Sequence, residues 1–330
     1  MVAQLSWLYV KTRPYKALSR LLSYALFEGR PVTTKGRWIN PFLFALLNVE
    51  KTIPALKKVE KPIFIVGTGR SGSTLLGLIL SLHPQIGFLN EPKALWHAIY
   101  PQEDLTGSYS QKNAYYSLTE AEINDEVRQT AHRLYSFYLS LTGSKRVLDK
   151  YPEMIFRVSF VKEIFPDAKL IFLVRNGWNT CQSIAKWSER FGKFENGATS
   201  DWWGVNDRKW KLLVEQLVNT HPDFRVIKEE VSKLDSHVDK GAVEWILTMQ
   251  QGLEAMQETH HSIYQLRYEE LTLDPARSLT EVLEFCQLPY DQKMINFACQ
   301  TITPTGPSRP VPLNPILLPS FEATMHQLGY

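Results

Sequence analysis

Between residues 61 and 295, short apolar runs alternate with longer segments whose apolar positions recur every three or four residues. Short runs bounded by turn residues indicate buried strands, and the longer spacing indicates amphipathic helices. The predicted strands are Ile63–Val66, Ile86–Leu89, Arg146–Leu148, Leu170–Val174 and Ile263–Arg267. Because strands that alternate with helices favour a parallel sheet, the pattern predicts an α/β fold with a central parallel sheet flanked by helices.

The helical spacing is clearest directly after the first predicted strand. There, apolar residues stand at i, i+3, i+4 and i+7, namely Leu75, Leu78, Ile79 and Leu82. This spacing predicts a helix that buries one face on the sheet. Similar patterns predict helices within Ile155–Phe165 and Ala242–Met256, and residues 102–145 are typical of a polar, partly helical insertion.

The first 60 residues form a basic extension. The first 40 contain seven Lys or Arg residues and one acidic residue, Glu28. Apolar residues recur at helical spacing from Pro14 to Gly29, at Tyr15, Leu18, Leu22 and Leu26. This helix could rest on an anionic membrane as a basic amphipathic helix, or pack on the main domain. We favour packing on the main domain, because a charged helix face is more often exposed to water than bound to a membrane.

The C-terminal residues 296–330 are rich in proline. We expect them to pack on the domain, with little regular structure after Thr301. The chain is therefore predicted to consist of a helical extension at 1–60, one main domain at 61–295 and this tail.

Composition narrows the classes of function. The chain has 330 residues, 44% of them apolar, and a net charge of +3, too small to suggest nucleic-acid binding. Its three cysteines, Cys181, Cys286 and Cys299, form no CxxC pair, which argues against a disulfide framework or a zinc site. No apolar run is long enough to cross a bilayer, and no secretory signal is evident. We expect a cytoplasmic protein, with peripheral membrane contact through the basic extension left open.

A glycine-rich loop follows the first predicted strand. Residues 67–74 read GTGRSGST and fit the phosphate-binding pattern GxxxxGK[ST], except that Ser73 replaces the lysine. Such a loop points successive backbone N–H groups, and the start of the next helix, at an anion. A tight turn without a ligand is the alternative, but it would not need three glycines, an arginine and four hydroxyl side chains. With the strand pattern, the loop predicts a single P-loop-NTPase-like domain.

The missing lysine argues against a nucleoside triphosphate, whose β- and γ-phosphates that lysine contacts. Arg70 offers a different cation, earlier in the loop. The nearest candidate for a magnesium ligand is Asp149, but Lys150 follows it and would repel the ion. We therefore predict a donor anion that is handled without a metal.

Charged or aromatic residues follow each of the other predicted strands. Asn90-Glu91-Pro92 follows the second strand, and Asp149-Lys150-Tyr151-Pro152 ends the third. Arg175 follows the fourth strand, with Ser183 eight residues later, and Tyr268-Glu269-Glu270 follows the fifth. Because ligands of open parallel sheets bind outside the carboxyl ends of the strands, we expect these residues to surround the glycine loop.

Together these segments resemble the sulfotransferases that use 3′-phosphoadenosine 5′-phosphosulfate (PAPS). The resemblance covers about residues 61–295 and rests on GTGRSGSTLL, NEP, DKYP, FPDAKLIFLVRNGWNTCQS and RYEEL. The loop is more similar to that of the Golgi-type and bacterial branch, which has an RSGT-like loop, than to that of the cytosolic branch with lysine.

The resemblance implies a set of donor contacts. The loop residues Gly69, Arg70, Ser71, Gly72, Ser73 and Thr74 would bind the 5′-phosphosulfate of PAPS. Arg175 and Ser183 would bind its 3′-phosphate, Tyr268 would contact the nucleotide, and Arg309 in the tail would close over the phosphates. Two departures from the family pattern, Asn176-Gly177 after Arg175 and Trp187 in place of a basic residue, shift more of the 3′-phosphate binding to Arg175, Arg309 or Arg190.

Sulfuryl transfer to an alcohol needs a base, cations and an in-line arrangement of donor and acceptor. We assign the base to Glu91, as the resemblance also implies, and expect burial to raise its pKa above the ordinary value of ~4.3. Its alternative role is to cap a helix, and His97 and His83 are the reserve bases. Lys150 and Arg70 would stabilise the developing charge, whereas the alternative for Lys150 is a surface salt bridge.

The acceptor pocket is less defined. Five of the nine tryptophans lie between Trp178 and Trp210, and Trp202-Trp203-Gly204 would either stack on an acceptor or belong to the core. We predict a sulfotransferase that moves SO₃ from PAPS to a hydroxyl of a carbohydrate or lipid-like molecule and releases adenosine 3′,5′-bisphosphate (PAP). A P-loop kinase or NTPase and a non-catalytic nucleotide-binding module are the alternatives.

Overall fold

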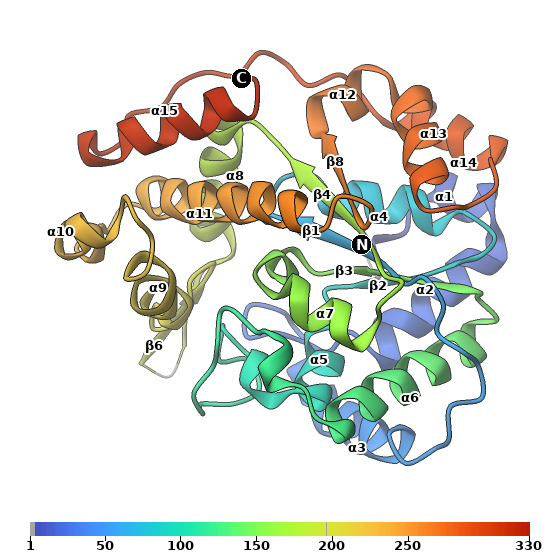
Figure 1. Ribbon diagram of the computed structural model, residues 1–330. Coiled ribbons are helices and arrows are strands. Elements are labelled where there is room, and N and C mark those ends of the chain that lie inside the picture. Colours follow the sequence, from blue (N-terminus) through green and yellow to red (C-terminus); the bar gives the residue numbers. More distant parts are fainter. Residues whose placement is uncertain (1–3, 196) are drawn as a thin grey trace.

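The computed structural model describes residues 4–195 and 197–330 and is built around a five-stranded parallel sheet (Figure 1). The strands are β1 (Ile63–Gly67), β2 (Ile86–Asn90), β3 (Arg146–Lys150), β4 (Lys169–Val174) and β8 (Ile263–Arg267). They lie in the order β2-β3-β1-β4-β8, and every neighbouring pair is parallel. All five predicted strands and the α/β class are confirmed.

Two hydrophobic cores cover the two faces of the sheet, because side chains alternate along each strand. Ile63 and Ile65 of β1 pack with helices α4 (Ser73–Ser81), α13 (Pro275–Phe285) and α14 (Gln292–Thr301). Phe64 and Val66 face the larger core on the other side. That core includes residues of α5 (Lys93–Ile99), α6 (Asp125–Thr142), α7 (Val158–Ile164), α8 (Gly177–Phe191) and α11 (His237–Glu258).

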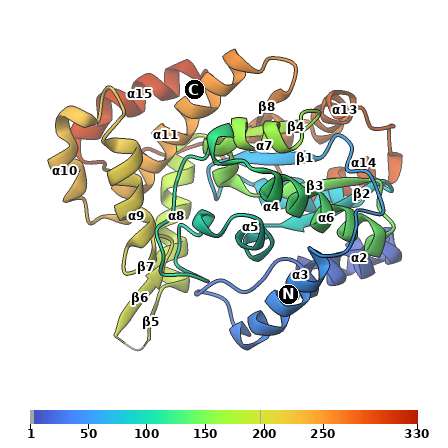
Figure 2. The ribbon, with the colours of Figure 1, turned by 60° about the horizontal axis from the view of Figure 1, so that its bottom comes forward.

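The outer edge of the sheet, strand β2, is covered by helix α2 (Pro14–Leu26) (Figure 2). Lys16 Nζ donates hydrogen bonds to the backbone oxygens of Pro84 and Ile86, at 2.9 and 2.6 Å. Further along the strand, the Asn90 backbone N–H donates to Glu28 Oε1 at 2.8 Å. Glu28 also forms a buried ion pair with Arg20, in which Arg20 Nη2 lies 2.8 Å from Glu28 Oε2. Charged side chains thus satisfy backbone groups that a sixth strand would otherwise pair.

The helix predicted after Arg13 is present and starts at Pro14, but its orientation is unexpected. Lys16 and Arg20 are buried, whereas Tyr15 and Leu18, which belong to the apolar stripe, are exposed. The interpretation that a basic helix face rests on a membrane is therefore wrong for α2, because that face is occupied by strand β2. Helices α1 (Trp7–Thr12) and α3 (Asn40–Glu50) complete the first 60 residues.

The C-terminal tail contains a helix that the sequence did not predict. Helix α15 (Leu318–Gln327) packs on α11, and its Phe321 is buried against Trp178 and Trp245. The expectation of little regular structure after Thr301 is wrong for this segment. A small antiparallel sheet of β5 (Lys193–Glu195), β6 (Ala198–Asp201) and β7 (Gly204–Val205) is also new.

The remaining helices connect these layers. They are α9 (Arg208–Leu213), α10 (Lys228–Ser232) and α12 (Tyr268–Leu273). Short 3₁₀ segments include Arg37–Ile39 and Pro152–Arg157, and Val214–Val218 forms a π-helical turn. Within residues 4–195 and 197–330, no helix combines the length and the apolar character that crossing a bilayer requires.

Candidate active site

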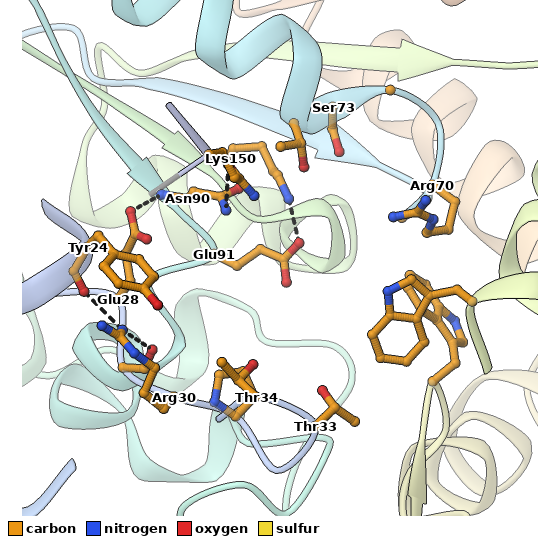
Figure 3. Close-up of a pocket in the computed structure, with 18 of the residues that line it drawn as sticks. Tyr24, Glu28, Arg30, Thr33, Thr34, Arg70, Ser73, Asn90, Glu91 and Lys150 are labelled. Atoms are coloured by element: carbon orange, nitrogen blue, oxygen red, sulfur yellow. Dashed lines mark hydrogen bonds and ion pairs between the residues drawn. The ribbon is translucent and has the colours of Figure 1, made fainter. Parts of the chain in front are cut away.

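A cavity of about 570 Å³ lies at the carboxyl ends of the parallel strands (Figure 3). One side, here named the strand-end wall, is formed by nine of the predicted site residues: Gly69, Arg70, Gly72, Ser73, Thr74, Glu91, Lys150, Arg175 and Tyr268. A smaller cavity of about 90 Å³ continues from it and shares Gly69, Glu91, Trp187 and Trp202. A volume of this size is typical of small-molecule sites, which hold roughly 300–1,000 Å³.

The glycine loop between β1 and α4 needs its glycines. Gly67 and Gly72 have φ angles of +135° and +96°, which other residues rarely adopt. A Cβ atom on Gly67 would lie 2.6 Å from the backbone oxygen of Leu173, and one on Gly72 would overlap the Tyr268 ring. Arg70 also has a positive φ, +68°, although it is not a glycine. Such backbone strain in a non-glycine residue tends to occur at functional sites.

The hydroxyls of the loop have different surroundings. Ser73 and Thr74, at the start of α4, line the cavity. Ser71 is buried, and its Oγ donates to the Thr68 backbone oxygen at 2.7 Å. The Ser71 hydroxyl therefore holds the loop in shape, while the other two face the cavity.

Residues from three separate strand ends meet around Arg70. Arg175 Nη1 donates to the Arg70 backbone oxygen at 2.9 Å, and the Arg175 guanidinium lies 4.5 Å from the centroid of the Tyr268 ring. Arg70 Nε donates to Ser183 Oγ at 3.3 Å. Two arginines are thus concentrated beside the positive end of α4, where an anion would be stabilised.

Glu91 and Lys150 form an ion pair inside the cavity (Figure 3). The Lys150 side chain is buried, whereas that of Glu91 is 39% exposed and reaches into open space. Glu91 has a φ of +50°, and its backbone N–H donates to the Lys150 oxygen at 2.7 Å, which extends the β2–β3 pairing by one residue. Glu91 is the second non-glycine residue of the strand-end wall in a strained conformation.

The surroundings of Glu91 lower its pKa. Burial alone would raise this pKa, but the ammonium groups of Lys150 and Lys93 outweigh burial and hold it below its ordinary value. The expectation that burial raises the pKa of Glu91 is therefore wrong. The carboxylate is ionised at neutral pH, so it can accept a proton without first losing one.

Behind Glu91 lies a buried chain of alternating charges that the sequence did not reveal. The Lys93 Nζ atom lies 3.8 Å from a carboxylate oxygen of Glu91 and 3.8 Å from one of Glu153. The Lys209 Nζ atom lies 3.3 Å from a carboxylate oxygen of Glu153 and 2.5 Å from one of Glu244. Burial would raise the pKa of Glu153, but Lys93 and Lys209 lower it to about 2. Lys93, two residues after Glu91, was the one available signal. The other members come from distant segments and could not be connected without the fold.

The other polar candidates lie elsewhere. Asp149 points into the core, where it accepts hydrogen bonds from Trp96 Nε1 at 2.9 Å and the Tyr135 hydroxyl at 2.5 Å, and burial raises its pKa to about 7. Neither His83 nor His97 lines the cavity. The Arg309 side chain is exposed and outside the cavity lining, although its backbone oxygen accepts from Gln182 on α8 at 3.1 Å. Among the described residues, no group of three or more His, Cys, Asp or Glu is placed to hold a metal.

Comparison with known proteins agrees with this geometry. A family model described as "Sulfotransferase family" matches residues 62–225, the segment that contains the glycine loop, Glu91, Lys150 and Arg175. The chain belongs to the sulfotransferase family. The match ends before β8, so it includes neither Tyr268 nor the tail.

Several curated proteins are similar to this member of the family. Protein-tyrosine sulfotransferase A of Caenorhabditis elegans is 22% identical over 71% of this chain and 52% of its own length. An uncharacterized protein of Aquifex aeolicus is 24% identical over 72% of this chain, which spans 27% of that protein. The matched part thus covers about half or less of these relatives. Among solved structures, the sulfotransferase domain from the curacin biosynthetic pathway is 16% identical, with 83% of this chain and 99% of that chain covered and a TM-score of 0.49.

Tryptophans form part of the cavity in this sulfotransferase-family chain. Trp187 and Trp202 line it with their ring centroids 5.4 Å apart and their planes at 76°. Trp202 Nε1 donates to Glu244 at 2.7 Å, which links it to the chain of alternating charges. Trp203 and Trp210 are buried in the core instead, so only part of the predicted aromatic wall reaches the cavity.

The opposite side of the cavity, here named the N-terminal wall, was missed by the sequence analysis. It consists of Gln4, Arg20, Tyr24, Glu28, Gly29, Arg30, Pro31, Thr33 and Thr34. Figure 3 shows Tyr24, Arg30, Thr33 and Thr34 facing Arg70 across the cavity, with Glu91 and Lys150 between them. No motif marks these residues, and the helical spacing in α2 concerned a different face of that helix.

Proposed function

We propose that this chain transfers a sulfuryl group from PAPS to the hydroxyl of an acceptor, either a carbohydrate or a lipid-like small molecule. The observation that carries the proposal is the Glu91–Lys150 ion pair, which shares one cavity with the glycine loop and Arg70. A base, a buried cation and an anion-binding helix start are the groups that this reaction requires.

The positive charge of the strand-end wall supports the proposed donor. Neither Arg70 nor Arg175 has a carboxylate within 4 Å in the described parts of the chain, so both guanidinium groups are available to anions. We assign the 5′-phosphosulfate to residues 69–74 and the 3′-phosphate to Arg175 and Ser183. Tyr268 would contact the nucleotide, and Arg309 would close over the phosphates from the tail.

In the proposed reaction, Glu91 takes the proton of the acceptor hydroxyl as that oxygen forms its bond to sulfur. The bond between sulfur and the bridging phosphate oxygen breaks on the opposite side, and PAP leaves with the electron pair. The Lys150 ammonium, held beside Glu91, stabilises negative charge on the transferring group and the leaving oxygen, with help from Arg70. The low pKa of Glu91 keeps it ionised in the resting state.

We propose that the acceptor lies between Trp187 and Trp202 on one side and the N-terminal wall on the other. Aromatic faces bind sugar rings and apolar groups alike, which is why both acceptor classes remain in the proposal. We expect a cytoplasmic location, with peripheral membrane contact through the N-terminal extension.

The proposal is tested by incubating the purified chain with ³⁵S-labelled PAPS and a panel of carbohydrate, lipid, phenolic and tyrosine-peptide acceptors. Transfer of the label in the presence of EDTA supports a sulfotransferase and rejects a magnesium-dependent P-loop kinase or NTPase. Tight binding of PAP without transfer to any acceptor class would instead support a non-catalytic nucleotide-binding module.

A further inference from the structure

The N-terminal extension exposes an unusual share of large apolar side chains. Of the fifteen such side chains that are exposed in the described parts of the chain, eight lie before residue 61. The most exposed are Trp7 (80%), Trp38 (75%), Leu56 (73%) and Phe42 (71%), and Leu18 is 60% exposed. Single exposed apolar residues are ordinary, but a concentration of them in one segment makes that segment the candidate for an interaction surface.

Helix α2 explains why the apolar side chains face outward. Lys16 and Arg20 are committed to strand β2 and to Glu28, so the polar face of the helix is turned inward. Tyr15, Leu18 and Leu21 are then left on the outer face. A surface helix of a globular protein normally has the opposite orientation, with its apolar face toward the core.

The exposed charges of this segment all have one sign. Between residues 4 and 50, the exposed charged side chains are those of Lys11, Lys35 and Arg37, and none of the three forms an ion pair in the described structure. Both acids of this segment, Glu28 and Glu50, are buried. Cations interspersed with Trp, Phe and Leu are the composition of surfaces that lie in the interface of an anionic bilayer.

The exposed residues are connected to the cavity through the chain itself. Thr33 and Thr34 belong to the N-terminal wall, and the next residues are Lys35, Arg37 and Trp38. Helices α2 and α3 both contact α6, which places them on the same side of the molecule, the side of strand β2 (Figure 2). Any partner that binds α1, α2 and the start of α3 would therefore lie next to the N-terminal wall.

We propose that α1, the outer face of α2 and residues 35–42 form a docking surface for membranes rich in anionic phospholipid. Trp7, Leu18, Trp38 and Phe42 insert among the lipid headgroups, and Lys11, Lys35 and Arg37 contact the lipid phosphates. This surface differs from the basic helix face considered in the sequence analysis, because the basic residues of α2 itself are buried. The proposal does not depend on the chemistry of the cavity.

The first experiment is co-sedimentation of the full chain with vesicles. One set is phosphatidylcholine alone, and the other contains about one-third phosphatidylglycerol. We expect binding to the anionic vesicles, at least about tenfold weaker binding to neutral ones, and loss of binding as salt is raised. Absence of binding to the anionic vesicles would overturn the proposal. Equal binding to anionic and neutral vesicles would also overturn it, because the three cations would then play no part.

Two variants separate the apolar and charged parts of the surface. L18S/W38S/F42S and K11E/K35E/R37E should each weaken binding to anionic vesicles by at least about tenfold. The control V226S/L273S changes two equally exposed side chains outside the extension and should bind like the wild type. If the control loses binding as much as the apolar variant does, the surface is not specific and the proposal fails.

A second copy of the chain is the competing occupant. Sedimentation velocity of the wild type and of L18S/W38S/F42S distinguishes a membrane from a second copy as the occupant. If the wild type is a dimer and this variant is a monomer, the surface serves self-association and the proposal is overturned. The charge-reversal variant alters only exposed side chains, so it keeps the test decisive if the apolar variant misfolds. Trp7 and Trp38 are the two exposed tryptophans in the described parts of the chain, and their fluorescence should shift to the blue on anionic vesicles but not on neutral ones.

Discussion

The two walls of the cavity are built by different physical means. The strand-end wall consists of short loops at the ends of parallel strands, and sheet hydrogen bonding alone brings those ends together. The N-terminal wall is positioned by side chains, because Lys16 and Glu28 bond the backbone of strand β2 about 60 to 70 residues away in sequence. The first wall therefore depends on topology, whereas the second depends on a few buried charged groups.

This difference suggests that changes in the strand-end wall affect chemistry and donor binding, and changes in the N-terminal wall affect stability. Single substitutions in each wall can test that separation.

Replacing the proposed base should have the largest effect. Glu91→Gln removes the proton acceptor but keeps the shape, so turnover should fall by about 10²- to 10⁴-fold while PAP affinity changes little. Turnover is measured with labelled PAPS, and PAP affinity by calorimetry. Glu270→Gln, an exposed glutamate just after strand β8, is the control and should behave like the wild type. Normal turnover in Glu91→Gln would refute the base assignment.

Breaking the buried ion pair of the N-terminal wall should have a large effect on folding. Glu28→Gln leaves Arg20 buried without its counter-charge and should lower the free energy of unfolding by about 3–5 kcal/mol. Urea denaturation measures this change, and hydrogen exchange should show faster exchange in β2. The exposed Glu60→Gln is the control and should leave the free energy of unfolding nearly unchanged. If Glu28→Gln is equally harmless, the N-terminal wall is not held by this ion pair.

Removing Arg175 should affect one phosphate of the donor. Arg175→Ala should weaken the binding of PAPS by about 10- to 100-fold, which is the range for loss of a hydrogen bond to a charged group. The affinity for adenosine 5′-phosphosulfate, which has no 3′-phosphate, should be nearly unchanged. Calorimetric titration of both nucleotides provides the measurement, with exposed Arg277→Ala as the control. Equal weakening of both would show that Arg175 does not contact the 3′-phosphate.

The smallest effect is a pH dependence in the N-terminal extension. Glu50, at the end of α3, is buried, and neither of its carboxyl oxygens has a hydrogen-bond partner in the described structure. Burial raises the pKa of Glu50 to about 7. Between the ordinary value of 4.5 and about 7, the folded state holds a proton that the unfolded state has lost. The stability contributed by this group is therefore present below that window and is lost as pH rises through it.

Glu50→Gln should remove this dependence. We expect it to stabilise the chain by roughly 1–2 kcal/mol at pH 8 and hardly at all at pH 4. Urea denaturation at both pH values, with exposed Glu126→Gln as the control, measures the difference. A gain that is the same at both pH values would mean that titration of Glu50 is not its source.

The same contrast explains what could be predicted from the sequence. The five strands were evident because each is a short apolar run, and Glu91, Lys150, Arg175 and Tyr268 were evident because they follow strand ends. The N-terminal wall was not evident, because the apolar spacing of α2 suggested a buried apolar face and gave no sign that strand β2 would engage its charges. The direction of the Glu91 pKa shift was also missed, because Lys150, which lowers this pKa more than Lys93 does, approaches Glu91 only in the folded chain.

The cover that α2 places on strand β2 also has a practical consequence. The family match begins at residue 62, which would be a natural point at which to shorten the chain. A protein cut there would lose Lys16, Arg20 and Glu28 and present a bare β-strand to its neighbours in solution. Bare strands recruit further strands, so we expect the shortened protein to aggregate even though every residue that the family match shares with the cavity is retained.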